Sequence, residues 1–290
     1  MVVSVIIPTL GRANLPAAVR SATTQGEPVE VIVVNDSGAP LDRDGLSDDV
    51  VVLDTAGRQG AAAARNLGLE RASGDFIAFL DDDDEWLRGH LADALRVLDQ
   101  RRDIDIYSCR SLVVDADGNG RLEPAELLQT GTIQNHFFGP QSWYARSRRL
   151  PTPTLVFRRR LAAHRHDESL RRRQDTWWLL TAERDMKARL HQSGHIGVVV
   201  YVDRPRQQGI DVSADHAAWA RRLDTIQPGS GAMQVVSRGR AAARAGDLRA
   251  LTTLAHELRA LPEGRKYLAV LGLQGVVAGG IAAKRRLLHR

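Results

Sequence analysis

Apolar runs and segments of helical periodicity alternate along the first third of the chain. We expect buried strands where the apolar runs are compact and end at polar or turn residues: Val2–Ile7, Val29–Val34, Val50–Leu53 and Phe76–Leu80. Between them, apolar residues recur at helical spacing over Asn14–Thr24 and Gly60–Ala72. This alternation predicts an α/β fold, in which helices flank a mostly parallel sheet.

The rest of the chain is less regular. Further strands are predicted at Ile104–Val114, Thr154–Phe157 and Val198–Val202, and a helix is predicted at Gln174–Leu190. From about Ala214 onward the pattern is helical and rich in alanine and arginine. The sequence therefore predicts a mixed α/β domain that is followed by a C-terminal helical extension.

Polar residues directly follow three of the predicted strands. Thr9 and Asp36 come just after the first and second strands, and Asp81–Asp84 follow the strand that ends at Leu80. In open α/β sheets, ligands bind outside the carboxyl ends of the strands. We therefore expect these side chains to meet at one edge of the sheet and to form the binding site.

The densest polar group is the segment FLDDDDEW, Phe79–Trp86. Adjacent carboxylates repel one another, and a divalent cation is the obvious compensator. Mg²⁺ or Mn²⁺ prefers oxygen ligands and usually binds through one or two carboxylates together with substrate phosphates. The alternative is an acidic cap on a following helix. The position of the aspartates at the end of a strand favours the cation.

Composition and charge narrow the function classes. Of 290 residues, 43% are hydrophobic, which is enough to bury a sizeable core. The single cysteine, Cys109, permits no internal disulfide, and we expect neither a signal peptide nor a membrane span. The net charge of +5 comes almost entirely from arginine, which suits phosphate and carboxylate partners. The basic residues are spread out without a recognition motif, so we expect no nucleic-acid partner.

Several segments together resemble the inverting glycosyltransferases of family 2, which have the GT-A fold and use nucleotide-sugar donors. The matching segments are SVIIPT (Ser4–Thr9), VVNDSG (Val33–Gly38), AAARNLGL (Ala62–Leu69), GDFIAFLDDDDEW (Gly74–Trp86) and, more faintly, RRRQDTWWLL (Arg171–Leu180). The resemblance implies a glycosyltransferase domain at 1–215 and a C-terminal helical extension at 216–290. Within the domain, residues 1–110 would bind the nucleotide sugar, and residues 111–215 would bind the acceptor and carry out catalysis.

The resemblance also implies roles for individual residues. Asp175 matches the aspartate that acts as general base, and Asp83 matches the metal ligand. Asp36 would accept a hydrogen bond from the base of the nucleotide, and Asp81 would contact the ribose. The full set of implied nucleotide-sugar-binding residues is Pro8, Thr9, Asp36, Arg65, Asp81, Asp82 and Arg206.

The chain departs from the family pattern at three places. Gln174 stands where the family has a glutamate before the base, and His166 stands where a phenylalanine usually precedes the Asp167-Glu168 pair. The family often has a histidine five residues before a serine near the diphosphate, but here Gln208 precedes Ser213. Arg204 or Arg206 is the alternative contact to the phosphates.

We therefore expect an enzyme that transfers a sugar, with inversion, from a UDP- or TDP-sugar to an acceptor hydroxyl, assisted by Mg²⁺ or Mn²⁺. The acceptor would be a glycan, a lipid-linked molecule or a small molecule, and the location would be cytoplasmic. Two alternatives stay open. One is a sugar nucleotidyltransferase, for which Thr9–Arg12 is a poor version of the glycine-rich basic loop. The other is a nucleotide-sugar-binding protein without catalysis.

Two further segments allow more than one interpretation. Asp115–Glu126 fits the pattern of an EF-hand calcium loop, but the strand-like segment before it and Pro124 within it favour a β-hairpin turn. The tail Tyr267–Ala283 is apolar and glycine-rich and leads into Lys284–Arg286. It leaves open a peripheral contact with the inner face of the membrane, a helix packed on the domain, or a homodimer contact.

Aromatic and histidine side chains near the proposed base are also of interest. We expect His164 and His166 on a surface helix or loop rather than in a metal cluster. For Trp177 and Trp178, packing in the core and contact with the acceptor stay open as alternatives, which includes one tryptophan in each role.

Overall fold

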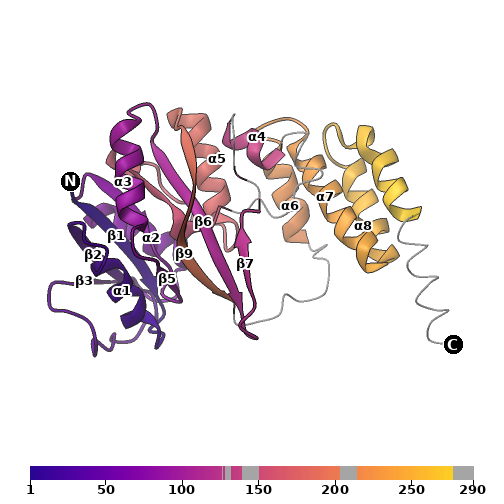
Figure 1. Ribbon diagram of the computed structural model, residues 1–290. Coiled ribbons are helices and arrows are strands. Elements are labelled where there is room, and N and C mark those ends of the chain that lie inside the picture. The colour runs from indigo at the N-terminus through magenta and orange to yellow at the C-terminus, as the bar shows by residue number, and fades with distance from the viewer. Residues whose placement is uncertain (126, 128–131, 139–149, 203–213, 277–290) are drawn as a thin grey trace. The chain divides into compact units, whose positions relative to one another are not determined.

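The computed structural model describes residues 1–125, 127, 132–138, 150–202 and 214–276 (Figure 1). The chain divides into two compact units. The first contains Met1–His136 and Ala145–Pro205, and the second contains Phe137–Tyr144 and Arg206–Arg290. The predicted boundary between residues 215 and 216 stays a prediction.

The first unit begins with the parallel strands that the apolar runs predict. These are β1 (Val3–Thr9), β2 (Val29–Asn35), β3 (Val51–Asp54) and β4 (Phe76–Phe79). β1 pairs in parallel with both β2 and β4, and β2 pairs in parallel with β3. Helices α1 (Leu15–Thr23) and α2 (Ala61–Arg71) connect strands of this group. The carboxyl ends of β1, β2 and β4 therefore lie at one edge of the sheet.

The second half of the sheet is mixed. Its strands are β5 (Asp84–Trp86), β6 (Ile106–Asp115), β7 (Gly120–Glu123), β8 (Val156–Arg158) and β9 (Leu190–Val202). The strand order is β3-β2-β1-β4-β8-β6-β9-β5, with β7 paired to β6. β8 runs antiparallel to β4 and β6, whereas β6 and β9 are parallel. The expected mostly parallel, mixed sheet is confirmed.

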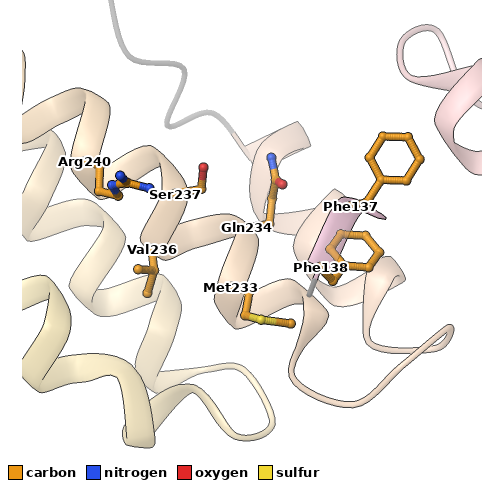
Figure 2. A pocket seen from close by; sticks show the side chains of 7 residues that line it. All are labelled: Phe137, Phe138, Met233, Gln234, Val236, Ser237 and Arg240. Carbon is orange, nitrogen blue, oxygen red and sulfur yellow. The ribbon is translucent and has the colours of Figure 1, made fainter. Parts of the chain in front are cut away.

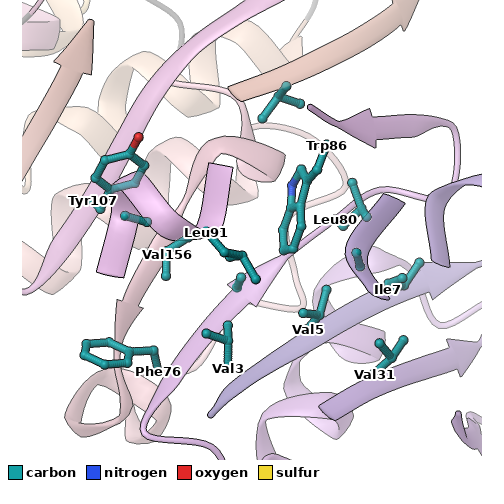
Figure 3. Close-up of a cluster of buried hydrophobic side chains, with 14 of the residues drawn as sticks. Val3, Val5, Ile7, Val31, Phe76, Leu80, Trp86, Leu91, Tyr107 and Val156 are labelled. Carbon is teal, nitrogen blue, oxygen red and sulfur yellow. The ribbon is translucent and has the colours of Figure 1, made fainter. Parts of the chain in front are cut away.

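Helices cover both faces of the sheet because successive side chains of its strands point to opposite sides. On one face, Val3, Val5 and Ile7 pack with residues of α1 and α3 (His90–Gln100) in a buried hydrophobic core (Figure 3). On the other face, α2 approaches β1 so closely that a Cβ on Gly68 would lie 2.4 Å from Ile6. This close packing fixes the first turn of α2 next to the ends of β1 and β2.

Helix α5 (Gln174–Met186) lies on the same face as α2 and carries the proposed base. Both of its tryptophans are buried, which favours core packing, one of the two alternatives that the sequence leaves open. Trp178 packs against Phe79 and Phe157 and stacks on His166 at 5.6 Å between ring centroids. The expected surface position of His166 is wrong, because its ring is buried in this aromatic cluster between Phe79 and Trp178.

Two local features differ from the sequence-based prediction, and a third decides between two alternatives that the sequence left open. α5 ends at Met186 rather than at Leu190, because Lys187 adopts a left-handed backbone (φ 55°) and Leu190 begins β9. α3 and β5 were not expected. β6 and β7 form an antiparallel hairpin around Asp115–Asn119, as favoured over the EF-hand; Glu126 lies outside the described residues.

The chain also contains one short α-helix and three 3₁₀ turns among the described residues. α4 spans Ile133–Phe138, and 3₁₀ turns span Thr152–Thr154, Arg159–Ala163 and, in the second unit, Gly264–Tyr267.

The second unit is helical, as expected for the extension. It contains α6 (Ala214–Leu223), α7 (Ser230–Ala245) and α8 (Leu248–Arg259), which bury a core of alanine, valine and leucine side chains. Within this unit, Phe137 and Phe138 lie with one side of α7 around a cavity of about 40 Å³ (Figure 2). No helix in the described ranges is long and apolar enough to cross a bilayer. The tail Lys284–Arg286 is not among these residues.

Candidate functional site

The carboxyl ends of β1, β2 and β4 form a cavity of about 330 Å³ together with the first turn of α2. We call it the acidic cavity, because four of its lining residues are aspartates. Its lining residues are Pro8, Thr9, Leu10, Arg12, Asp36, Gly60, Ala61, Arg65, Asp81, Asp82 and Asp83. The structure thus brings together all the nucleotide-sugar and metal residues that the sequence indicated, apart from Arg206, which lies outside the described residues. Their individual roles stay predictions.

The acidic motif is held by a network of hydrogen bonds to the end of β1. Asp82 is 4% exposed and accepts a hydrogen bond from the hydroxyl of Thr9 at 2.6 Å. Nη1 of Arg12 lies 2.7 Å from Oδ1 of Asp82 and 2.6 Å from Oδ2 of Asp83. A single guanidinium nitrogen therefore bridges two carboxylates of the motif. Sequence reasoning missed this role, because Arg12 was considered only as part of a poor glycine-rich loop.

Burial and mutual repulsion disturb the titration of two aspartates in this motif. Burial, together with the charges of Asp81 and Asp82, raises the pKa of Asp83, although Arg12 acts in the opposite direction. Burial, followed by the charges of Asp81 and Asp83, raises the pKa of Asp84 to about 8. Carboxylates disturbed in this way gain from a nearby cation, which restores the ionised form.

The residues fit a cation of the magnesium type. Asp83 keeps 35% of its side chain exposed while it lines the cavity, so an oxygen ligand is accessible there. In the described part of the chain, no group of three or more histidine, cysteine, aspartate or glutamate side chains is placed to hold a metal alone. A cation that takes one or two carboxylates and completes its shell with phosphates and water matches this arrangement.

Asp36 has a clear structural task. Its carboxylate accepts hydrogen bonds from the hydroxyl of Thr55, from the backbone N–H of Gln59 at 2.8 Å and from that of Gly60 at 2.7 Å. These bonds fix the loop that leads into α2. Thr55 and Gln59 carry no motif that sequence reasoning could have used. The proposed bond from Asp36 to a nucleotide base stays a prediction.

A second, larger cavity of about 700 Å³ adjoins the first. The two cavities share Gly60, Ala61 and Arg65 as lining residues. The second is lined by Arg58, Gln59, Gly60, Ala61, Ala62, Arg65, Thr152, Glu168, Ser169, Leu170, Arg171, Arg172, Arg173, Gln174 and Asp175. We call it the arginine cavity. It contains the predicted general base, Asp175, at the first turn of α5.

Arg65 joins the two cavities. It is 6% exposed, its Nη2 donates to Oδ1 of Asp81 at 2.6 Å, and its Nη1 donates to Oε1 of Gln174 at 3.4 Å. The guanidinium also lies over the ring of Phe79, 5.7 Å from the centroid. The departure from the family's glutamate at Gln174 thus places a neutral partner beside this arginine. The half-buried Asp175 follows, and its Oδ1 accepts the N–H of Thr176 at 2.7 Å.

Comparison with known proteins agrees with this geometry. The model of the family "Glycosyl transferase family 2" matches residues 4–165. A relative from Erwinia amylovora, the amylovoran biosynthesis glycosyltransferase AmsB, is 29% identical over 163 residues, which cover 50% of this chain and 51% of AmsB. The putative teichuronic acid biosynthesis glycosyltransferase TuaG of Bacillus subtilis is 36% identical over 107 residues, covering 34% of this chain and 42% of TuaG.

A third relative is the GalNAc(5)-diNAcBac-PP-undecaprenol beta-1,3-glucosyltransferase of Campylobacter jejuni, 38% identical over 101 residues, or 31% of this chain and 32% of the relative. The chain thus spans a third to a half of the length of these curated relatives.

Solved structures share the fold. The crystal structure of S. aureus TarS in complex with UDP-GlcNAc superposes with a TM-score of 0.62 at 18% identity, covering 96% of this chain and 89% of TarS residues in that structure. The expected GT-A fold and the expected glycosyltransferase family are therefore confirmed. The family model, which covers more than half of the chain, shows that it belongs to glycosyl transferase family 2.

Proposed function

We propose that this chain transfers a sugar, with inversion, from a UDP- or TDP-sugar to an acceptor hydroxyl. The observation that carries the proposal is the adjacency of the two cavities. One holds the acidic motif, the other holds Asp175, and Arg65 lines both. A donor in the acidic cavity and an acceptor beside Asp175 would therefore meet at Arg65, where transfer would take place.

On the donor side, the first turn of α2 faces both cavities through Gly60 and Ala61. Backbone N–H groups at the start of a helix, with the helix dipole, favour phosphate groups. Members of the family typically use a divalent metal, and Mg²⁺ or Mn²⁺ at Asp83 would offset the charge that develops on the leaving diphosphate. Arg65 would hold Asp81 in place as the nucleotide binds.

On the acceptor side, Asp175 would take the proton from the attacking hydroxyl. General base catalysis of this kind contributes about 10²–10⁴-fold to the rate. Attack from the face opposite the leaving diphosphate inverts the sugar carbon in one displacement, and no nucleophile from the protein is required.

The comparisons support the class of donor and acceptor. The similar fold of TarS binds UDP-GlcNAc, which favours a UDP-linked donor here. The relatives are named for the synthesis of amylovoran, teichuronic acid and a polyprenyl-diphosphate glycan, which favours a glycan or lipid-linked acceptor. Family membership favours transfer over the nucleotidyltransferase alternative. Cytoplasmic location, membrane contact of the tail and a homodimer stay predictions.

The Asp175→Asn variant tests the proposal. We expect sugar transfer to fall by about 10²–10⁴-fold, while UDP-sugar binding, followed by thermal stabilisation in Mn²⁺, is retained. Asp49→Asn in an exposed loop is the matched control and should keep full transfer. Unchanged transfer by Asp175→Asn would remove the base assignment. An absence of transfer in the wild type with every nucleotide sugar, although one binds, would favour the non-catalytic alternative.

A further inference from the structure

The wall of the arginine cavity carries an excess of positive charge. Five arginines line it, against two carboxylates, Glu168 and Asp175. Oε1 of Glu168 already accepts a hydrogen bond from Nδ2 of Asn66 at 2.8 Å. Arg65 is neutralised by Asp81. The remaining arginines, Arg58 and Arg171–Arg173, therefore outnumber the nearby negative charges.

Three of these arginines have no side-chain partner among the residues that the structure describes. In the first unit, five described arginines make no side-chain hydrogen bond or ion pair with any described residue: Arg20, Arg58, Arg88, Arg171 and Arg172. Three of the five line this one cavity. Elsewhere in the unit, most described arginines that are exposed are paired, as Arg96 is with Asp93 and Arg101 is with Asp103, and Arg20 and Arg88 are the exceptions. The concentration of unpaired guanidinium groups beside Asp175 is therefore local.

The backbone around the cavity adds a second, independent observation. Only four described residues other than glycine have a positive φ, and two of them, Arg58 (φ 51°) and Arg173 (φ 62°), line this cavity. A left-handed backbone is unfavourable for a residue with a Cβ, and glycine would avoid this cost. The strained loops are held in place: the N–H of Arg58 donates to the carbonyl of Asp36 at 2.7 Å. Fixed loops of this kind present their side chains at a set position.

We propose that the arginine cavity binds an acceptor that carries phosphate or carboxylate groups close to the hydroxyl that receives the sugar. This inference rests on the proposed function, because it takes the cavity that contains Asp175 as the acceptor site. A neutral acceptor would offer Arg58, Arg171 and Arg172 only uncharged oxygen acceptors, whose hydrogen bonds are weaker than those of an anion. An anionic acceptor forms charge-assisted, bidentate bonds with them and is drawn in by the local field.

Probe binding tests the inference without knowledge of the natural acceptor. Wild-type protein is titrated with inorganic tripolyphosphate, tri-galacturonate and neutral maltotriose, each with and without saturating UDP and Mn²⁺. We expect at least one anionic probe to bind, whether or not UDP is present, and maltotriose to bind at least tenfold more weakly. The tighter of the two anionic probes identifies phosphate or carboxylate as the group recognised.

Two double variants with the same loss of charge locate the site. Arg171→Ala/Arg172→Ala should weaken binding of the anionic probe by about tenfold or more, while Arg20→Ala/Arg88→Ala, which removes two unpaired arginines outside the cavity, should not. Equal binding of maltotriose, an equal loss in the control pair, or loss of the probe when UDP and Mn²⁺ are added would overturn the inference. The last result would assign these arginines to the donor diphosphate.

The same experiment separates this inference from the proposed function. UDP binding, which the proposed function assigns to the acidic cavity, is measured in each variant. Loss of the anionic probe with UDP binding retained supports the acceptor inference alone. Failure of every nucleotide to bind the wild type would contradict the proposed donor site, and the titrations without UDP would still decide whether the arginine cavity recognises anions.

Discussion

The acidic cavity and the arginine cavity share one side of α2 but hold their charges in opposite ways. In the acidic cavity, every aspartate that lines it accepts a hydrogen bond from the protein, as in the contacts of Asp82 with Thr9 and Arg12. In the arginine cavity, Arg58, Arg171 and Arg172 have no described partner. The first is a preorganised site in which the protein holds every aspartate by hydrogen bonds, and the second leaves three arginines for a ligand to bind.

We expect the two cavities to have different tasks. The acidic cavity would hold the donor, and the arginines of the arginine cavity would select the acceptor. The residues of the acidic cavity follow strand ends, where the sheet fixes the backbone. The residues of the arginine cavity come mostly from the loops 58–60 and 168–173, which tolerate changes of sequence. We expect substitutions in the acidic cavity, like that of Asp175, to lower turnover strongly, and substitutions of Arg58, Arg171 or Arg172 to change which acceptor is used.

The largest effect, of the same order as that of Asp175→Asn, is expected for Asp83→Asn. Removing the accessible carboxylate of the acidic cavity should lower turnover by about 10³-fold, because a cation at the leaving diphosphate supplies several kcal/mol of stabilisation. Thermal stabilisation by Mn²⁺ with UDP should also disappear. Asp83→Glu, which keeps a carboxylate ligand, should retain part of both signals. If Asp83→Asn kept its Mn²⁺ response, the cation would have to bind elsewhere, and the contrast between the two cavities would lose its basis.

An intermediate effect is expected for Arg65→Met, which breaks the link between the cavities. The variant leaves Asp81 and Gln174 without their shared donor, so both UDP binding and acceptor-probe binding should weaken by about tenfold. Arg65→Lys keeps the charge but not the fork of the guanidinium and should recover only part of the loss. Isothermal titration of UDP and of the anionic probe checks this result. A loss confined to one ligand would show that Arg65 belongs to a single cavity.

The smallest effect concerns the pH range in which the two cavities can be compared. Burial lowers the pKa of His90 to about 3, because the ring lies at 0% exposure beside Trp86 and Tyr107. The unfolded chain takes up this proton near pH 6.5, so the free energy of unfolding should fall as the pH is lowered from about 6.5 towards 3. The slope from this group is at most about 1.4 kcal/mol per pH unit.

Urea unfolding of the wild type and of His90→Gln at pH 7, 6 and 5 measures this slope. The variant should lose stability less steeply between pH 6 and pH 5 than the wild type does. Parallel curves would show that other groups control the acid sensitivity. Probe titrations belong above pH 6.5 if the slopes differ as expected.

The sequence predicts strands that are compact apolar runs better than strands that depend on a pairing partner far away in the sequence. The first four strands are continuous apolar runs bounded by turn residues, and their ends carry the polar side chains of the acidic cavity. β5 escaped prediction because the segment Asp84–Trp86 is a strand only through its pairing with β9, more than a hundred residues away. Patterns within a short window cannot indicate such a pairing.

The arginine cavity could not be predicted from the sequence either, because contacts between distant segments form it. Arg65 and Gln174 are 109 residues apart in sequence, and only the packing of α2 and α5 on one face of the sheet brings them together. In the sequence, Arg171–Arg173 only form part of a faint match to the family, and no pattern assigns them a role. Likewise, no local pattern shows that Arg12 reaches from the end of β1 to the aspartates after β4.

The bridge made by Arg12 has a practical consequence for handling the protein. Arg12 already offsets the repulsion between the carboxylates of Asp82 and Asp83. We therefore expect the fold to be stable without a bound metal ion. The chain should survive purification in a chelator with its melting temperature intact and then accept different divalent ions in turn. The affinities of different divalent ions can thus be compared on one metal-free preparation. In each titration the ion competes with Arg12 for the carboxylates of Asp82 and Asp83.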